Sequence, residues 1–493
     1  MCHFRAGHVL LCRLVPWFRH TTVALVKDLL RRLGYLDLCS VCRGSYGCGR
    51  IMKLQSVGRH IAPEMLALWI VEMILTFTLT LVMITPSTGA ISVSYINPAI
   101  ACALTVGFTA FIIGVYRPQI FSGLHILLKS TILAALLSFP AVWLVCKLVG
   151  LSTYLPIGYD SLRPIKIIML WSICLLLTRL LFMVATRCGL FVHRVAVIGS
   201  EATPSIAATL LAQRKGFLEV SHFRPEEASA PLLRASKIRT LVTVGEKTVV
   251  PPAIITEYGS RGIKLQSEAD FWEQNFRRVD ISNLHGSLLS QIGQSTASLS
   301  TSWFGRAFDI LLSTILLVST LPIMCVVALL VRLESTGPVL YRQERVGLNG
   351  TVFTLFKFRS MRSDAEANGP RWAQLRDPRV TRLGSFMRKT RIDELPQLLN
   401  ILRGEMSFIG PRPERPHFVE QLEKVIPCYR ERCRVKPGLT GWAQVNYPYG
   451  ASVEDARAKL SFDLYYVKNR SLFLDILILL STVRVILLQE GAR

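Results

Sequence analysis

The chain has 493 residues, of which 51% are hydrophobic, and a formal net charge of +24. It is too long for one compact domain and too apolar for an ordinary soluble protein, so the composition indicates a membrane protein. Its basic residues are expected to face anionic lipid head groups and phosphorylated molecules rather than nucleic acid, because no zinc-finger or RNA-binding signature is present.

Residues 1–51 are rich in Arg, Cys and Gly. The spacing of Cys39, Cys42 and Cys48 suggests a metal site, but zinc needs a fourth ligand and none stands at a familiar spacing. We interpret this stretch as a basic, disordered extension, or as residues ahead of a natural start at Met52. No cleavable signal peptide is recognised.

Residues 52–189 are predicted to form a four-helix transmembrane domain. Basic residues precede its first apolar run and follow its last, so both ends are expected in the cytoplasm, although Arg163 and Lys166 oppose this orientation. Glu72 and Arg179 lie at membrane depth, where they either mark a transport path or pair between helices, and without a relay pairing or snorkelling is preferred. The runs cover residues 65–84, 99–116, 127–148 and 167–184, each near the length that crosses a bilayer.

Residues 190–286 alternate between strand and helix patterns, which predicts a Rossmann-like α/β domain. A dinucleotide-binding fingerprint needs three glycines, and the first turn supplies only Gly199. A structural or regulatory domain is therefore favoured over cofactor binding. Residues 287–302, rich in Ser, Thr and Gln, are predicted to be a linker. The expected elements are a buried strand at 195–200, a helix through 207–211 and a strand at 238–244.

A fifth apolar run, residues 308–333, is long enough to span a bilayer. Basic residues flank it on both sides, Arg306 before and Arg332 near its end. Ser319 and Pro322 lie in its middle, where the missing proline N–H would kink a helix. We therefore expect a re-entrant hairpin that enters and leaves on the cytoplasmic side. The alternative, a straight fifth span, would place the rest of the chain outside the cytoplasm.

Asp393 and Glu394 stand just ahead of a helical pattern at residues 395–402. The unpaired N–H groups of a helix N-terminus favour negative charge, so two acids and a phosphate can meet there if a cation joins them. An isolated Asp-Glu pair would be read as an ordinary helix cap. Here basic residues lie on both sides, among them Arg388 and Arg412, which favours a site.

Three further stretches carry a local prediction. A strand beginning at Phe353 ends with Lys357 and Arg359 on one face, as a phosphate clamp or as a solvated charged edge. Residues 436–445 are turn-rich and present an aromatic side chain, whereas residues 471–488 form an apolar helix that could lie on the bilayer.

Residues from about 303 to 493 resemble the bacterial sugar transferase family, the monotopic phosphoglycosyl transferases. The architecture ahead of them is similar to the long form of the family, which includes undecaprenyl-phosphate glucose and galactose phosphotransferases. The resemblance implies a mixed α/β catalytic domain at 303–493 with a re-entrant membrane helix. Besides the proline-broken hairpin, the matching stretches are Gly337–Gln343, Phe356–Met361, Arg391–Leu398, Gly404–Pro413 and Gly438–Val445.

The resemblance also implies a reaction. A hexose-1-phosphate would pass from a UDP-sugar to undecaprenyl phosphate with release of UMP, through a covalent aspartyl phosphosugar on Asp393, while Glu394 would bind Mg²⁺. Such a transfer begins lipid-linked glycan assembly for exopolysaccharide, capsule or O-antigen at the bacterial inner membrane, with the catalytic domain in the cytoplasm. Membrane lipid and downstream membrane glycosyltransferases are the implied partners, and a homo-oligomer is left open. The substrate-binding candidates are Lys357, Arg359, Arg388, Pro411, Arg412 and Pro413.

Two alternative classes of function remain open from the sequence. A transporter or scaffold with an accessory cytoplasmic domain predicts no UMP release from a UDP-sugar. A membrane-bound nucleotide-dependent oxidoreductase, which rests on Gly199, predicts bound NAD after purification. The sequence does not reveal which sugar is transferred, because the matching motifs concern phosphate and nucleotide.

Overall fold

The computed structural model describes residues 63–85, 93–117, 120–121, 123–148, 163–189, 192–198, 218–223, 238, 240–243, 264–281, 303–362, 365, 369, 377–448, 450 and 452–487. They fall into two compact units, and the second contains residues 108–115, 125–143 and 266–493. Residues 266–493 alone are called here the C-terminal unit. Each unit is described by itself. The predicted extension 1–51, the helix at 207–211, Gly199 and the linker 287–302 lie outside the described residues.

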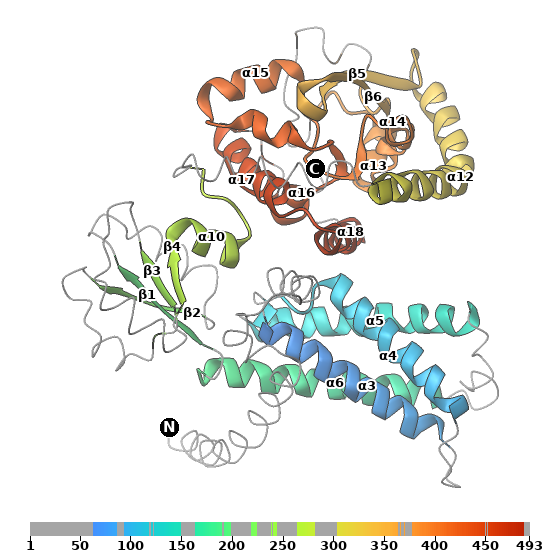
Figure 1. Cartoon of the computed structure of the whole chain (residues 1–493). Helices are drawn as coiled ribbons and strands as arrows, with labels where there is room; N and C mark the ends of the chain where they lie inside the picture. The colour runs from blue at the N-terminus through green and yellow to red at the C-terminus, as the bar shows by residue number, and fades with distance from the viewer. Residues whose placement is uncertain are drawn as a thin grey trace. The chain divides into compact units, whose positions relative to one another are not determined.

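Four long apolar helices lie within the predicted transmembrane region (Figure 1). They match the four predicted runs, and each is long and apolar enough to cross a membrane. Membrane association therefore follows from the structure as well as from composition. The helices are α3 (Pro63–Ile84), α4 (Val93–Ile113), α5 (Leu124–Leu148) and α6 (Arg163–Arg187).

The two ionisable residues at membrane depth pair with each other. Arg179 of α6 donates from Nε to Glu72 Oε1 at 3.0 Å and from Nη2 to Oε2 at 2.9 Å. The Tyr116 hydroxyl donates to the same Oε2 at 2.7 Å. Both charged side chains are buried, so the bidentate pair satisfies them where water is absent. The predicted pairing is confirmed, and neither charge needs a transport path to explain it.

A small sheet follows the transmembrane helices in the chain. Its order is β2-β1-β3-β4, and β1 pairs in parallel with both β2 and β3. Parallel neighbours need crossover connections, as in the predicted α/β domain, but the residues that would form them lie outside the described ranges. The Rossmann-like assignment therefore stays a prediction. The strands are β1 (His193–Ile198), β2 (Leu218–Phe223), β3 (Thr240–Thr243) and β4 (Lys264–Ser267).

The C-terminal unit is a mixed α/β fold around one apolar core. Two strands, β5 (Leu340–Val346) and β6 (Val352–Phe358), form an antiparallel hairpin, while β7 (Ser407–Ile409) and β8 (Gly438–Thr440) pair in parallel. Helices pack around these pairs and bury Leu, Ile, Val and Tyr side chains between them. The helices are α13 (Arg382–Thr390), α14 (Gln397–Arg403), α15 (Pro416–Val425), α16 (Trp442–Asn446), α17 (Val453–Asn469) and α18 (Leu472–Leu487).

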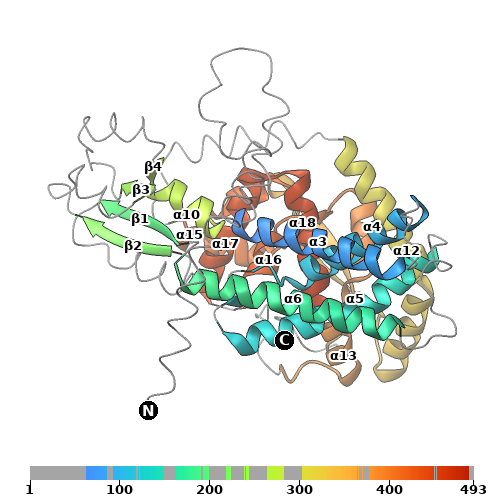
Figure 2. The same cartoon turned by 90° about the horizontal axis from the view of Figure 1, so that it is seen from below.

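The predicted hairpin region is one helix, α12 (Trp303–Glu334), with Pro322 inside it. Figure 1 shows its olive first half and yellow second half running in different directions, and Figure 2 shows the same bend. Many of its large apolar side chains are exposed, Leu311 and Val318 among them, as expected for a surface that faces lipid.

Both ends of α12 are tied to the C-terminal unit by arginines. At its start, Arg306 donates to the carbonyls of Ile401 and Leu402, both at 2.6 Å, and so caps the end of α14. Beyond its end, Arg359 donates to the carbonyls of Ser335 at 2.7 Å and Thr336 at 3.1 Å. The last carbonyls of a helix have no partner within the helix, so a guanidinium satisfies them well. One body therefore holds both ends of this helix.

Helix α10 (Glu268–Phe276) also belongs to the C-terminal unit. Val279 and Ile281, which follow it, are buried in the same apolar cluster as Leu464. The domain boundary at residue 286 stays a prediction. Residues 268–281 nevertheless pack against the core formed by residues of the predicted catalytic domain.

Candidate active site

Asp393 and Glu394 lie in a tight turn between two helices. Helix α13 ends at Arg391, whose left-handed backbone (φ 59°) turns the chain, and a 3₁₀ turn covers Ile392–Glu394. Helix α14 begins only after Pro396. The acids therefore precede α14, as expected, but occupy a separate turn rather than its cap. Both are about 7% exposed, so water screens their charges poorly.

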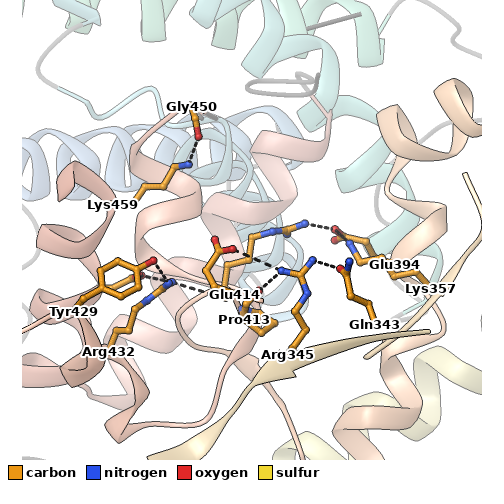
Figure 3. Close-up of polar contacts among 12 residues, drawn as sticks. Gln343, Arg345, Lys357, Glu394, Pro413, Glu414, Tyr429, Arg432, Gly450 and Lys459 are labelled. Carbon is orange, nitrogen blue, oxygen red and sulfur yellow. Dashed lines mark hydrogen bonds and ion pairs between the residues drawn. The ribbon is translucent and has the colours of Figure 1, made fainter. Parts of the chain in front are cut away.

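Three cations converge on one oxygen of Glu394. Its Oε1 lies 2.8 Å from Arg412 Nη2, 3.1 Å from Lys357 Nζ and 3.5 Å from Arg391 Nη1. Figure 3 shows Lys357 and Glu394 facing each other, with the Arg345 side chain close by. Among the described residues, no hydrogen bond reaches Glu394 Oε2, which leaves that oxygen for a ligand.

The cations decide the protonation of this acid. Burial alone would raise the pKa of Glu394, but Lys357, Arg412 and Arg391 hold the pKa well below its ordinary value. Burial lowers the pKa of Lys357, and Glu394 opposes that shift. Glu394 is therefore ionised at neutral pH, and its charge is balanced by groups that also suit phosphate.

Asp393 is held differently. Its buried Oδ1 accepts no hydrogen bond from the described residues. Burial raises the pKa of Asp393, and Glu394 adds to the shift, whereas Lys357, Arg412 and Arg388 lower it. A buried carboxylate oxygen without a partner is costly, and such groups usually have a reactive or ligand-binding role. The two adjacent acids therefore have pKa values shifted in opposite directions.

The turn that carries Arg412 is fixed by its backbone. The carbonyl of Pro411 accepts from the N–H of Gly438 at 2.9 Å, and that of Pro413 accepts from Arg345 Nη1 at 3.0 Å. Between them, the Arg412 carbonyl accepts from Arg432 Nη2 at 2.9 Å. Donors from three different elements therefore orient the turn so that the Arg412 side chain reaches Glu394.

A buried network stands behind this turn. Arg432 donates to the Tyr429 hydroxyl at 2.9 Å (Figure 3). Arg432 Nη2 also lies 2.8 Å from Asp463 Oδ2. Burial raises the pKa of Asp463 to about 6, although Arg432 opposes the shift. This network was missed by the sequence reasoning, because Arg432 and Asp463 lie outside the stretches that carry a recognisable motif.

Asn400, which is fully buried, locks the strand of Lys357 to the helix behind the acids. Its Nδ2 donates to the Thr354 carbonyl at 2.7 Å and to Glu405 at 2.6 Å, and its Oδ1 accepts from the Phe356 N–H at 3.1 Å. These bonds fix strand β6 against α14. They therefore also help to hold Lys357, which lies on β6, beside Glu394. Asn400 lies in the helical pattern at residues 395–402 that follows the acids. A search of that pattern for polar residues at positions expected to be buried would have found it.

Residues 300–489 match the bacterial sugar transferase family. A putative undecaprenyl-phosphate N-acetylgalactosaminyl 1-phosphate transferase of Bacillus subtilis (strain 168) is 54% identical over 127 residues, which cover 26% of this chain and 71% of that protein. The chain belongs to the bacterial sugar transferase family.

Two longer relatives are similar over smaller shares of their length. The UDP-N-acetylgalactosamine-undecaprenyl-phosphate N-acetylgalactosaminephosphotransferase of Aeromonas hydrophila is 47% identical over 44% of this chain and 50% of its own length. The UDP-glucose:undecaprenyl-phosphate glucose-1-phosphate transferase of Escherichia coli (strain K12) is 43% identical over 36% of this chain and 39% of its own. The chain thus spans half or less of the length of these two sugar transferases.

The structure separates Lys357 from Arg359, which were expected to act as one clamp in this sugar transferase. Lys357 faces Glu394, whereas Arg359 points to the end of α12 and donates to the main chain of Ser335 and Thr336. Substrate binding by Arg359 stays a prediction, but its observed bonds give it a structural role.

The other predicted substrate-binding residues differ in how closely they approach the acids. Arg388, on the last turn of α13, is near enough to lower the pKa of Asp393, but no contact of its own is shown. Pro411 and Pro413 contribute backbone carbonyls to the turn rather than a side chain that faces Glu394. Ser319 and Pro322 lie within α12, as predicted for the bend.

One prediction about the 436–445 stretch is wrong. Trp442 is not presented to solvent; it is 4% exposed and donates from Nε1 to the Arg277 carbonyl at 2.9 Å. The glycines explain the turn-rich sequence instead. A Cβ on Gly410 would lie 2.2 Å from the Lys436 carbonyl oxygen, and one on Gly438 would lie 2.1 Å from the Gly410 nitrogen. Only glycine lets these two backbones approach so closely.

The acids suit a hard cation such as Mg²⁺, although they do not form a complete cage. Among the described residues, no group of three His, Cys, Asp or Glu side chains gathers. The free oxygen of Asp393 and Glu394 Oε2 are the available oxygen donors. Mg²⁺ is commonly held by one or two carboxylates, phosphate oxygens of the substrate and water, so two acids are enough.

Proposed function

We propose that this sugar transferase moves a hexose-1-phosphate from a UDP-sugar to undecaprenyl phosphate and releases UMP. The observation that carries the proposal is the pair of buried acids with opposite pKa shifts, ringed by Lys357, Arg412 and Arg391. The names of the relatives from Aeromonas hydrophila and Escherichia coli state the same donor class and the same lipid.

In the first step, a carboxylate oxygen of Asp393 attacks the phosphorus that bears the sugar. A bond forms between that oxygen and the phosphorus, and the bond from the phosphorus to the bridging oxygen of the diphosphate breaks. UMP leaves with the electron pair, and no proton is transferred. The raised pKa of Asp393 marks an anion that the protein stabilises little, which favours its use as a nucleophile.

In the second step, a phosphate oxygen of the lipid attacks the same phosphorus and displaces the Asp393 carboxylate. The product is a lipid-linked sugar diphosphate, and the acid returns to its starting form. Dividing the transfer into two displacements lets a small protein site handle a nucleotide and a lipid in turn. When bound, Mg²⁺ would supply charge neutralisation at the diphosphate, with Glu394 as its ligand.

The basic residues would neutralise the phosphates. Arg412 has a planar guanidinium that suits two phosphate oxygens, and its turn is rigid, so we assign it to the nucleotide. Lys357 is a point charge beside both acids and suits the phosphate under attack. Each must exchange part of its bond to Glu394 for the substrate, which Glu394 can offset by binding the metal.

The bent helix α12 would set the site at the membrane surface. Because Arg306 and Arg359 tie both ends of α12 to the C-terminal unit, this unit and both helix ends belong on one side of the bilayer. A straight span of 32 residues would be ~48 Å long and would separate its ends by more than a bilayer core. We infer a re-entrant helix that reaches the head groups, where a lipid phosphate lies.

The location follows from the reaction. UDP-sugars are supplied in the cytoplasm, so we infer that the C-terminal unit faces the cytoplasm at the inner membrane. Lipid-linked glycan assembly for exopolysaccharide, capsule or O-antigen would begin with this step and continue with membrane glycosyltransferases that use its product.

The reaction is tested with the purified full chain in detergent and undecaprenyl phosphate. UDP-glucose, UDP-galactose and their N-acetylated forms are offered separately, and UMP and lipid-linked product are both measured. Equal amounts of UMP and product with at least one donor are expected. Absence of UMP with every donor would overturn the proposal and favour a scaffold or transporter.

The re-entrant helix is tested by labelling. In a background without the native cysteines, of which Cys188 and Cys325 are exposed, Trp303→Cys places a single exposed thiol at the first residue of α12 and Glu344→Cys places one beyond its end. In sealed inside-out vesicles, a membrane-impermeant maleimide is expected to label both. Labelling of only one of them would establish a straight span.

A further inference from the structure

We propose that residues 268–281, named here the clasp, act as a positioning element that holds the 438–446 segment against the turn of Arg412. The clasp lies ahead of the region that matches the family, which begins at residue 300. The inference rests on the proposed function for its kinetic consequence, but not for its structural one.

The clasp forms for local reasons. Ser267, the last residue of β4, caps helix α10, and its hydroxyl accepts from the Asp270 N–H at 3.2 Å. The helix ends at Arg277, which adopts the left-handed conformation with φ 55°. The following residues can therefore leave the helix at once and run along the core.

One anchor of the clasp is ionic. Glu273 Oε2 lies 2.6 Å from Lys468 Nζ, and its Oε1 accepts from Asn469 Nδ2 at 2.6 Å. Both charged side chains are only 13% exposed, so this pair is shielded more than a surface salt bridge. It fixes α10 to the last turn of α17.

Two other anchors use the backbone. The Arg277 carbonyl accepts from Trp442 Nε1 at 2.9 Å, and the Val279 N–H donates to the Ser461 carbonyl at 2.9 Å. Val279 and Ile281 are buried in the cluster that contains Trp442. Figure 2 shows α10 beside α17, and the contacts above place it against α16 as well.

The anchored segment reaches the active site through close backbone contacts. Trp442 follows Gly441, and a Cβ on Gly441 would lie 2.1 Å from the Gly410 carbonyl oxygen. Gly410 in turn donates to the Thr440 carbonyl at 2.9 Å and precedes Pro411. Backbones that pack without side chains between them transmit displacement directly. A shift of Trp442 would therefore move the turn that aims Arg412 at Glu394.

The clasp also follows directly on strand β4 of the small sheet. Strand β4 runs into α10 without an intervening residue, because β4 ends at Ser267 and α10 begins at Glu268. The edge strand of the α/β sheet is thus covalently continuous with an element of the sugar transferase core.

The test uses the full chain with variants outside the catalytic machinery. Glu273→Ala removes the ionic anchor, and Trp442→Phe removes the indole N–H together with part of the ring. The exchange Glu273→Lys with Lys468→Glu restores an ion pair with reversed charges. Gln274→Ala, an exposed neighbour on the same helix, is the matched control. Steady-state kinetics for the UDP-sugar and amide hydrogen exchange of residues 438–446 are both measured.

We expect Glu273→Ala and Trp442→Phe to raise KM for the UDP-sugar at least about threefold, with kcat within about twofold of wild type. Exchange at 438–446 is expected to accelerate in both, and the double exchange and Gln274→Ala to stay within about twofold of wild type. A purely structural role would lower the active fraction and kcat without moving KM. Wild-type KM and exchange in both single variants would overturn the proposal.

The two proposals fail separately. If the wild-type chain transfers no sugar phosphate, the proposed function is wrong, and hydrogen exchange alone decides the clasp. Faster exchange at 438–446 in Trp442→Phe would then still support it, and unchanged exchange would reject it. Should Glu273→Ala fail to fold, Trp442→Phe provides a second comparison through a different anchor of the clasp.

Discussion

Arg412 donates from Nη2 to Glu394 Oε1 at 2.8 Å, across 18 residues of sequence. The pair joins the 3₁₀ turn of the acids to the Pro-Arg-Pro turn, and Glu394 raises the pKa of Arg412 further above its already high value. Since Arg432 holds the Arg412 carbonyl from behind, the cation is fixed at both its backbone and its side chain. Arrangement of charge before substrate arrives is what lowers a barrier in phosphoryl transfer.

The nucleophile is tested by Asp393→Asn, which preserves shape but removes the attacking anion. We expect transfer to fall at least roughly 10³-fold while the protein stays folded. Mass spectrometry should detect a phosphosugar adduct on the wild-type peptide after incubation with UDP-sugar alone, and none on the variant. Near wild-type transfer by Asp393→Asn would exclude Asp393 as the nucleophile.

The pH dependence of kcat should report Asp393. Burial raises its pKa, so the carboxylate is protonated and inactive at pH values where an ordinary aspartate is still ionised. Activity should therefore fall with decreasing pH through a pKa above 3.8, the ordinary value. The pKa of Glu394 is held well below its ordinary value, so Glu394 does not set this limb.

A Lys357 variant tests whether the acid limb of the pH profile arises from Asp393. Because Lys357 lowers the pKa of Asp393, Lys357→Gln should move the acid limb of the residual activity to higher pH. The measurement is kcat against pH for both proteins. A limb that moves to lower pH, or does not move, would contradict the assignment.

Arg359→Gln distinguishes support from substrate binding. The guanidinium donates to the carbonyls of Ser335 and Thr336, so its loss should lower the free energy of unfolding by about 2–3 kcal/mol. KM for the UDP-sugar of the remaining folded protein should stay near wild type. A large rise in KM with an unchanged Tm would show that Arg359 contacts substrate.

Asn400→Leu tests the lock between β6 and α14. The change keeps the volume but leaves the partly buried Phe356 N–H and Thr354 carbonyl without their side-chain partner, so we expect a loss of about 1–3 kcal/mol and a lower Tm. Lys389→Ala, on the exposed face of α13, serves as the control. Equal Tm values for the two variants would show that Asn400 is dispensable.

Gly410→Ala compares a steric clash with backbone strain. The added Cβ would lie 2.2 Å from the Lys436 carbonyl oxygen, so the β7–β8 pair must separate. We expect a larger loss of stability than in Gly350→Ala, where φ is +83° but no atom lies within 4 Å of the new Cβ. The latter should cost about 1–2 kcal/mol. Thermal unfolding of both variants decides the order.

Much of this protein follows from local sequence. The four transmembrane helices were predicted within a few residues, because about twenty consecutive apolar residues have few alternatives to a membrane helix. For Glu72 and Arg179 the sequence favoured pairing between helices or snorkelling, since an isolated charge is costly in lipid, and the structure shows the pairing. In the site, the adjacent acids and Arg412 were found from motifs in which the chemistry and the sequence spacing coincide.

Other features depend on contacts between residues that are distant in sequence, and local sequence patterns do not predict such contacts. The period-two spacing of Lys357 and Arg359 predicted a shared face, but Lys357 faces Glu394, whereas Arg359 donates to the two carbonyls that follow α12. The turn-rich sequence around Trp442 predicted that the stretch presents an aromatic side chain, yet its glycines allow close backbone packing and Trp442 is buried.

The sequence by itself determined the membrane helices, the acid pair and the family, because these are written in consecutive residues. Only the tertiary structure decided which cations meet Glu394, which arginine holds Arg412 and where residues 268–281 pack. The physical reason is that a charge or an apolar side chain is satisfied by whatever lies next to it in space. For Lys357 and Glu394 that neighbour is 37 residues away in sequence, and for Lys468 and Glu273 it is 195.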